Sequence, residues 1–353
     1  MKLGTHTPGG PVTDMPAAPV RVALIGAGRI GASHAAVLAR RVPEADLVAV
    51  VDPRLGAAEA VAGPLGARAE TEVDAVLQAA DVDAVVVTAS STAHAELVTA
   101  SAAHGKHVFC EKPAGMSLAE IDAGRTATDR AGVVLQVGFN RRFAAAFVAA
   151  HEAVLAGRVG QVQLMRSVTR DPGTGPADPG AVPRWTIFTQ TLIHDFDTLN
   201  WLNPGARAVD VLATADALVA PSYRDQGHLD TAVVVVRFDN GAIATAEASF
   251  AAAYGYDVRA EVFGSAGMVT MGDGATTSML IHDTGGRTAT TSRSDVELMR
   301  DAYTGELSEF ALAVQQGRRS AVTGDDAFAA FAVAEAAIES ARTGARAAVA
   351  VRP

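Results

Sequence analysis

RVALIGAGRIG, residues 21–31, runs from an apolar segment directly into three glycines spaced as GxGxxG. A buried strand, this turn and a following helix are typical of a dinucleotide-binding βαβ unit. The first glycine allows the tight turn, the second lets backbone approach a pyrophosphate, and the third lets helix and strand pack closely. The helix N-terminus then favours the negative phosphates. The residues expected to contact the cofactor here are Gly26, Gly28, Arg29, Ile30 and Gly31.

An acidic residue follows the next apolar run. Asp52 comes 21 residues after Gly31, where its carboxylate can accept hydrogen bonds from the adenosine ribose. The same charge repels a 2′-phosphate, so we predict NAD and not NADP as the cofactor. Arg54 lies close enough to belong to this part of the site. The alternative is a glycine turn that binds nothing.

Short apolar runs alternate with helical stretches through the first part of the chain. The runs are residues 21–27, 47–52, 83–88, 107–111 and 133–138, and the helical stretches include 30–41, 93–104 and 117–131. Strands of Val, Ile and Ala that read as continuously apolar are buried on both faces, and their alternation with helices predicts a parallel doubly wound sheet. We assign residues 20–139 to an NAD-binding Rossmann domain.

After about Asn140 the alternation of strands and helices ends, and predicted strands follow one another. Strands are predicted at residues 162–169, 208–214, 231–238, 242–250, 257–264, 268–271 and 279–282. The Asp-Asn-Gly turn at 239–241 joins two of them as a hairpin, and consecutive strands with tight turns make an antiparallel sheet. Helices at 303–316 and 325–342 could pack on either domain. Residues 140–353 are therefore expected to form an α+β domain for substrate binding and oligomerisation, with a large, mostly antiparallel open sheet.

Composition narrows the possible partners and the compartment. The 353 residues are enough for two domains, and 29 basic against 39 acidic residues give a net charge of −10, which favours neither nucleic acid nor an anionic membrane. One cysteine and the lack of an apolar run of about 18 residues favour a cytoplasmic protein without a membrane span. Residues 1–19 are expected to form a disordered leader. We predict a small neutral substrate and no metal site.

The segment Glu111-Lys112-Pro113 follows the fifth predicted strand. Ligands of such sheets bind at the carboxyl ends of the strands, so Lys112 is expected beside the cofactor. There its amine can polarise a substrate oxygen, and burial would lower its pKa. The alternative is an ordinary surface lysine.

A helix is expected from Gln190 through Leu202. Gln190, His194, Asp197 and Trp201 then share one face, and Leu192, Phe196 and Leu199 form the apolar stripe. A histidine on the polar face is available for proton transfer. The alternative for His194 is a solvated or capping residue.

These motifs, with several others, resemble those of a known family. The others are His34 after the glycine turn, FCEKP at 109–113, QVGFNRR at 136–142, RDP at 170–172 and YGYD at 254–257. The chain resembles the Gfo/Idh/MocA oxidoreductases from about Val20 to its end, and among them bacterial inositol 2-dehydrogenases. The resemblance implies a Rossmann domain followed by a domain whose open sheet builds dimers or tetramers.

The resemblance also implies site residues. Lys112 and His194 would be the catalytic pair. The cofactor site would extend to Ser90, His94, Glu111 and Lys112, and the substrate site would comprise Asn140, Arg141, Asp171, Gln190, Thr191 and Tyr256. Structural alternatives are an ion pair for Arg141 or Asp171 and strand packing for Tyr256.

Two positions depart from the family's usual pattern. Relatives usually carry Asp where Gln190 stands, four residues before the histidine, and the inositol enzymes tend to carry Asn where Asp171 stands. A neutral amide orients an imidazole less strongly than a carboxylate, so we expect Asp197 or Asp171 to be the partner of His194. The change at 171 moves a carboxylate to another wall of the pocket.

The function predicted from these residues is NAD-dependent hydride transfer between nicotinamide and a ring hydroxyl of a cyclitol or sugar. Two alternatives stay open. An NAD-using glycosidase of the same superfamily would show no net redox change, and an NAD-binding sensor, suggested by Gln190, would show no turnover.

Overall fold

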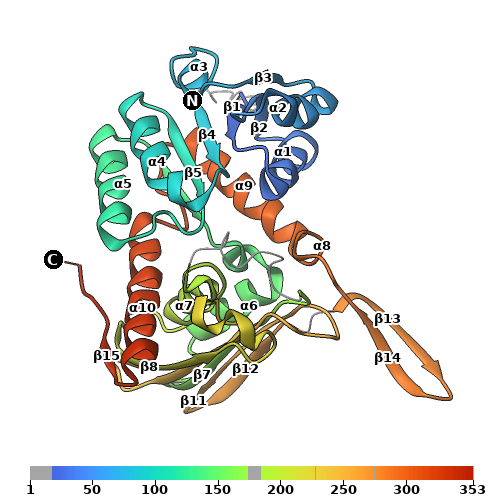
Figure 1. Ribbon diagram of the computed structural model, residues 1–353, viewed down its shortest axis with the longest axis vertical. Helices are drawn as coiled ribbons and strands as arrows, with labels where there is room; N and C mark the ends of the chain where they lie inside the picture. The colour runs from blue at the N-terminus through green and yellow to red at the C-terminus, as the bar shows by residue number, and fades with distance from the viewer. Residues whose placement is uncertain (1–17, 174–183, 227, 273–274, 353) are drawn as a thin grey trace, which may run out of the picture.

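The computed structural model describes residues 18–173, 184–226, 228–272 and 275–352, and the side chains of 275–278 are outside the description. The predicted leader therefore lies outside the described residues up to position 17. The described residues form two large sheets with helices around them, and a separate two-stranded hairpin (Figure 1). Within the described part, no helix combines the length and the apolar character needed to cross a membrane.

The first sheet is wholly parallel and confirms the predicted doubly wound fold. Its order, β3-β2-β1-β4-β5-β6, is the order of a Rossmann sheet. The strands are β1 (Val20–Ile25), β2 (Ala45–Val51), β3 (Arg68–Glu70), β4 (Ala84–Val87), β5 (His107–Glu111) and β6 (Leu135–Gly138). The helices are α1 (Arg29–Arg41), α2 (Leu55–Ala62), α3 (Val73–Leu77), α4 (His94–Ala103) and α5 (Leu118–Ala131). Strands β1 and β4 are buried almost throughout, which explains their continuous apolar sequence.

The second sheet has seven strands in the order β12-β11-β7-β10-β9-β8-β15. These are β7 (Val162–Arg170), β8 (Ala208–Asp216), β9 (Thr231–Phe238), β10 (Ile243–Ser249), β11 (Asp257–Gly264), β12 (Gly267–Met271) and β15 (Ala347–Ala348). The 239–241 turn joins β9 and β10 as predicted. One pair, β10 with β7, is parallel, because the chain reaches β10 only after β8 and β9. The sheet is therefore mixed and mostly antiparallel, as expected.

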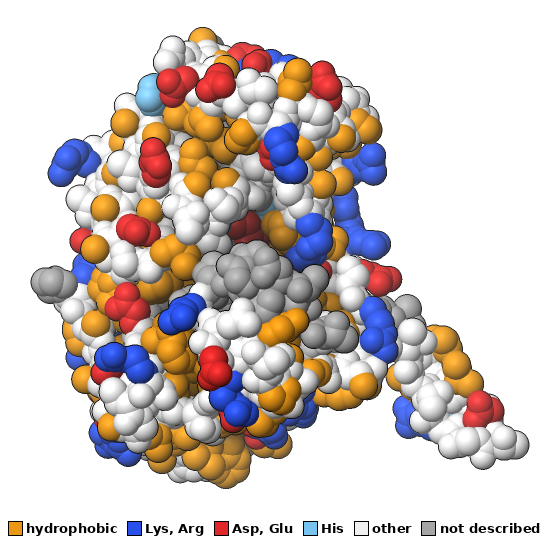
Figure 2. Space-filling view, viewed as in Figure 1, with side chains coloured by type: hydrophobic (Ala, Val, Ile, Leu, Met, Phe, Trp, Pro, Cys, Tyr) orange, Lys and Arg blue, Asp and Glu red, His pale blue; other side chains and the backbone are white. Residues whose placement is uncertain are grey.

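A two-stranded hairpin projects from the body of the molecule (Figures 1 and 2). Strand β13 (Ala275–Asp283) includes the predicted strand at 279–282, but it pairs with β14 (Gly286–Thr291) and not with the large sheet. Its chain leads directly into α8 (Asp295–Leu298), at the junction between the sheets.

The last two long helices pack on both parts of the chain. Helix α9 (Arg300–Gln315) returns to the Rossmann sheet, where Leu307, Phe310 and Ala311 join its core. Helix α10 (Gly324–Thr343) contacts α5 as well as α7 (Leu192–Trp201) and β8. The remaining helices are α6 (Ala145–Leu155), 3-10 turns at Gly63–Leu65, Ser91–Ala93, Asn140–Phe143 and Pro221–Gln226, and a π-helical turn at Ile187–Thr191.

Candidate active site

A cleft of about 560 Å³ opens where the carboxyl ends of the Rossmann strands face the second sheet. The structure brings most of the predicted site residues to it. Those that line it are Gly28, Arg29, Ile30, His94, Glu111, Lys112, Asn140, Arg141, Asp171, Gln190, Thr191, His194 and Tyr256.

The glycine turn has the geometry that backbone contact with a ligand requires. Gly26 has φ +106°, and a Cβ there would lie 2.5 Å from the Ala89 backbone nitrogen. A Cβ on Gly31 would lie 1.8 Å from the Gly26 carbonyl oxygen, so this glycine is needed for packing. Gly28 has nothing within 4 Å of such a Cβ, which leaves the turn open on that side. Helix α1 begins here without an acidic residue in its first turn.

Asp52 lies beside the same turn, just after β2. Its carboxylate accepts hydrogen bonds from the backbone N–H groups of Ala27 and Arg54, each at 3.0 Å. Burial opposes its charge, but these donors and the Arg54 guanidinium hold the pKa of Asp52 below its usual value. An ionised carboxylate at the end of β2 is the arrangement predicted from the sequence.

Lys112 is half-buried and lines the cleft. Its Nζ donates to the backbone carbonyl of Gln190 at 3.0 Å, so this contact does not depend on the side chain at position 190. Burial lowers the pKa of the Lys112 amine, and the charges of Glu111 and Asp171 oppose that fall. The alternative of a surface lysine is wrong.

His194 faces the same cleft from the first turn of α7. Burial, with the charges of Lys112 and Arg141, lowers the pKa of the imidazole well below its usual value. His194 is therefore uncharged at neutral pH and able to accept a proton. Its Nδ1 atom is buried without a hydrogen-bond partner among the described residues. The ring also packs edge-on against Phe139.

The helix face predicted for residues 190–202 is split in the structure. Gln190 lies in the π-helical turn and not in the α-helix, so its spacing to His194 differs from the expected one. Asp197 is buried away from the cleft and accepts a hydrogen bond from Arg142 Nε at 2.9 Å, while the Arg142 guanidinium lies over Trp201. The expectation that Asp197 partners His194 is wrong, because Arg142 already occupies its carboxylate. Asp171 lines the same cleft, but His194 Nδ1 has no hydrogen-bond partner among the described residues, so Asp171 does not hold the imidazole through that atom.

Arg141 reaches the cleft from a network that the sequence did not reveal. Its guanidinium pairs with Asp195 at 2.8 Å, and Asp195 also accepts from the Ser167 and Thr169 hydroxyls at 2.5 and 2.6 Å. Asp195 is fully buried and was not predicted as a site residue, although its neighbour His194 was. The ion-pair alternative for Arg141 is therefore realised, and it fixes the guanidinium at the edge of the cleft.

Asp171 and Tyr256 form part of the opposite wall. Burial raises the pKa of Asp171 to about 6, although Lys112 and Arg141 pull it down. Burial and the nearby charge of Asp171 also raise the pKa of the Tyr256 phenol, which stays protonated. This wall therefore offers a carboxylate that accepts hydrogen bonds and a hydroxyl that can donate one.

Several cleft residues come from segments that carry no motif. Thr88 donates its hydroxyl to the Gly26 carbonyl at 2.8 Å, and Asp295 of α8 pairs with both terminal nitrogens of Arg29 at 2.8 and 3.0 Å. Tyr303 also lines the cleft. Ser90, predicted for the cofactor, is exposed and does not line it, whereas the next residue, Ser91, does.

Comparisons with known proteins agree with this geometry. The sequence model of the Gfo/Idh/MocA oxidoreductase family, NAD-binding Rossmann fold, matches residues 20–139. The sequence model of the family's C-terminal alpha/beta domain matches residues 151–351. The chain belongs to the Gfo/Idh/MocA oxidoreductase family. It is 38% identical to inositol 2-dehydrogenase of Rhizobium meliloti, over 91% of this chain and 96% of the relative. It is 35% identical to scyllo-inositol 2-dehydrogenase (NAD(+)) of Bacillus subtilis, over 92% and 95%.

A solved structure shares the architecture of this chain. The structure of scyllo-inositol dehydrogenase from Lactobacillus casei, with bound NAD(H) and scyllo-inositol, has a TM-score of 0.90 at 25% identity and covers 94% of this chain and all of that one. The predictions of the family, of NAD as the cofactor and of an oxidoreductase are confirmed. The open glycine turn, the free N-terminus of α1 and the ionised Asp52 fit NAD.

Membership in a family of NAD-binding enzymes gives Asp52 a testable role. Replacing Asp52 by Ser removes the charge that repels a 2′-phosphate and leaves Arg54, which is mostly exposed, free to meet it. We expect D52S to raise kcat/KM with NADP relative to NAD by at least about tenfold, or 1.4 kcal/mol. Steady-state assays with both cofactors measure this ratio. Equal use of NAD and NADP by the unmodified protein would contradict it.

Proposed function

We propose that the protein is a dehydrogenase that moves hydride between NAD and a ring hydroxyl of a cyclitol such as an inositol. The observation that carries the proposal is that Lys112 and His194 line the same cleft as the glycine turn. The relatives named as inositol dehydrogenases support the substrate class. NAD, when bound, supplies the hydride acceptor at its nicotinamide ring.

Lys112 would hold the substrate oxygen. Its ammonium is half-buried and already donates to the Gln190 carbonyl, so little reorganisation is needed to donate a second hydrogen bond. As the hydroxyl loses its proton, negative charge develops on that oxygen, and a fixed cation in a dry site stabilises it. A lowered pKa also makes the Lys112 proton easier to share with that oxygen.

His194 would take the hydroxyl proton. The imidazole must be uncharged to accept it, and its depressed pKa keeps it so at neutral pH. Gln190, Thr191, Asn140 and Arg141 surround this end of the cleft and are proposed to bind the other hydroxyls of the ring with Asp171 and Tyr256. A mixture of acceptors and donors suits a polyol, in which each hydroxyl can do both.

The experiment that tests the function is NAD reduction against a panel of inositols, aminocyclitols and aldoses. We expect substrate-dependent NADH absorbance with at least one inositol. A net NADH yield from a free cyclitol separates this function from an NAD-using glycosidase, which returns the hydride. Tight NAD binding without NADH formation from any panel member would support a sensor and contradict the proposal.

Asp171 provides a prediction on pH. Its folded-state pKa of about 6 exceeds its ordinary value of 3.8, so the folded protein binds this proton more tightly. Keeping the carboxylate ionised therefore costs stability above pH 6, and the cost disappears as the pH falls towards 4. We expect D171N to raise the free energy of unfolding by about 1–3 kcal/mol at pH 8, with no gain near pH 4.

The same variant should change kcat/KM, and by different factors for different panel substrates, because Asn replaces a charged acceptor with a neutral amide that also donates. Denaturant unfolding at several pH values measures the first effect, and kcat/KM on the panel substrates measures the second. Asp301, which is exposed, supplies the control D301N, which should stay within about 0.5 kcal/mol. A D171N protein that is less stable than the unmodified one at pH 8 would overturn this reading.

Assembly into dimers or tetramers is part of the proposal. The strand register sets four exposed apolar side chains side by side across β12, β11, β7 and β10: Met268, Phe263, Leu164 and Ile243. Apolar side chains gather in Figure 2 along the lower edge, over the large sheet. Such a row favours contact with a second copy. We also propose a cytosolic location, since the single cysteine, Cys110, is buried and unpaired.

A further inference from the structure

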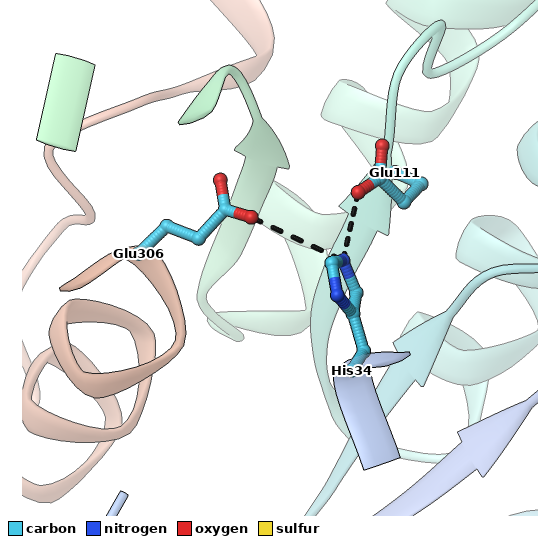
Figure 3. Close-up of side chains that lie close together, drawn as sticks. All are labelled: His34, Glu111 and Glu306. Atoms are coloured by element: carbon cyan, nitrogen blue, oxygen red, sulfur yellow. Dashed lines mark hydrogen bonds and ion pairs between the residues drawn. The ribbon is translucent and has the colours of Figure 1, made fainter. Parts of the chain in front are cut away.

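Three ionisable side chains meet beneath the cleft, one each from α1, β5 and α9 (Figure 3). His34 and Glu306 are fully buried, and neither lines the cleft, whereas Glu111 does. His34 Nε2 lies 2.7 Å from Glu111 Oε1 and 3.9 Å from Glu306 Oε1. The mechanism above uses neither His34 nor Glu306.

The surroundings of His34 determine how many protons its ring carries. Its Nδ1 is buried and has no partner among the described residues, and its edges contact the rings of Phe109 and Tyr303. A second ring proton would leave a charged N–H without an acceptor in an apolar setting, which is costly. The ring therefore carries one proton, on Nε2, and donates it to Glu111.

Glu306 lacks hydrogen-bond donors, whereas His34 lacks a second acceptor. Both of its carboxyl oxygens are buried without a hydrogen-bond donor in the part of the chain that the structure describes. An ionised carboxylate without donors is strongly disfavoured in such a place, and the ionised Glu111 nearby disfavours it further. Glu306 is therefore the neutral member of the pair.

Glu111 links this cluster to the catalytic lysine. While Oε1 accepts from His34, Oε2 accepts the backbone N–H of Lys112 at 3.1 Å. Burial opposes ionisation of Glu111, but the hydrogen bond from His34 and the charge of Lys112 hold the pKa of Glu111 below its usual value. A continuous chain of hydrogen bonds thus runs from α1 through Glu111 to the residue that carries the reacting amine.

We propose that His34 is a positioning residue for Lys112: uncharged, it holds Glu111 as the single carboxylate of the cluster, with Glu306 beside it as an uncharged acid. The proposal rests on the proposed function only for the role of Lys112 in turnover. A divalent cation held by the same three side chains is the competing arrangement. Metal–ligand distances of about 2.0–2.2 Å would keep ligand atoms about 3.3 Å apart, and the 2.7 Å between His34 and Glu111 is instead that of a hydrogen bond.

The charge states are tested without any substrate. The infrared difference spectrum between the unmodified protein and E306Q at pH 7 should contain the C=O stretch of one protonated carboxylic acid. The control E309Q, on the same helix, should lack that band, because Glu309 pairs with Arg318. A missing band in E306Q, or one equivalent of divalent metal that is lost in E306Q, would overturn the proposal.

The positioning role is tested with a matched pair at position 34. His34→Leu removes the donor to Glu111, and His34→Gln returns an N–H. Since a misplacement of about 1 Å can cost about 10²-fold, we expect H34L to lose about 10- to 10²-fold in kcat with KM nearly unchanged, H34Q to recover most of that loss, and E306Q to stay within about twofold. NAD affinity should not change in any of them.

A second readout stays valid even if the proposed function fails. The chain has three lysines, at 2, 106 and 112, so labelling of each by a lysine-selective reagent can be followed by mass spectrometry. We expect the labelling rate of Lys112, relative to Lys106, to change at least about threefold in H34L and to return towards normal in H34Q. If H34L leaves both the Lys112 labelling rate and kcat as they were, His34 has no positioning role. If H34L is unfolded, the Lys112 labelling rate is compared between E111Q, which removes the acceptor of the His34 hydrogen bond, and H34Q, which keeps a donor. Equal rates in these two variants and in the unmodified protein would then exclude the positioning role.

Discussion

Lys112→Ala and His194→Ala should each lower kcat by about 10²- to 10⁴-fold while NAD binding persists. The lysine variant loses the cation that stabilises charge on the substrate oxygen, and the histidine variant loses the proton acceptor. Neither side chain belongs to the glycine turn that fits NAD, so cofactor affinity should change little. Steady-state rates and a fluorescence titration of NADH measure the two quantities.

Matched controls separate this effect from general damage. Lys106→Ala removes an amine that donates to the Ala79 and Val82 carbonyls, and His104→Ala removes an exposed imidazole. Both should keep kcat within about twofold. Full activity in H194A would contradict the proposed mechanism, and Tyr256 would then be the next acid/base residue to test.

Asp197→Ala should destabilise the fold by about 3–5 kcal/mol, because it leaves the buried Arg142 without its main partner. Arg142 and Asp197 side chains are only 8% and 1% exposed, so water cannot replace the lost contact, and Asp326 at 3.0 Å compensates only in part. Equilibrium unfolding in denaturant gives the free energy, and an unchanged m-value shows that the variant still unfolds in one step.

The exposed pair Arg342–Glu339 provides the comparison. Glu339→Ala removes the partner of Arg342, at 2.7 Å on an exposed part of α10, and should cost less than about 1 kcal/mol. Equal losses in D197A and E339A would contradict the view that Asp197 serves the fold and not His194.

The sequence predicted the fold well where a pattern is local. The strand, glycine turn and helix at 20–41 and the continuously apolar strands gave the Rossmann sheet, and alternation gave most strands of the second sheet. Strand β3, Arg-Ala-Glu, was missed because three residues with two charges carry no apolar run. The parallel pairing of β10 with β7 and the separate hairpin β13–β14 depend on chain crossings that no local pattern encodes.

In the candidate active site, the sequence predicted those residues that belong to a recognisable motif. Lys112 and His194 do, and the structure places both in the cleft. The helical wheel failed for Gln190 because a π-helical turn precedes α7, and for Asp197 because Arg142, distant in sequence, binds that carboxylate. Asp295 and Tyr303 reach the cleft, and Glu306 reaches the cluster beneath it, only through the return of α8 and α9, so periodicity could not reveal them.

The most direct test of the central claim is to follow the transferred hydrogen. The protein is incubated with NAD and ring-deuterated inositol, and the mass of the NADH formed is measured. Transfer from a ring carbon to nicotinamide predicts NADH that carries one deuterium, at a rate reduced by a primary isotope effect unless product release limits turnover. NADH without deuterium, or no NADH from any inositol at saturating NAD, would contradict the claim that this cleft oxidises a cyclitol hydroxyl.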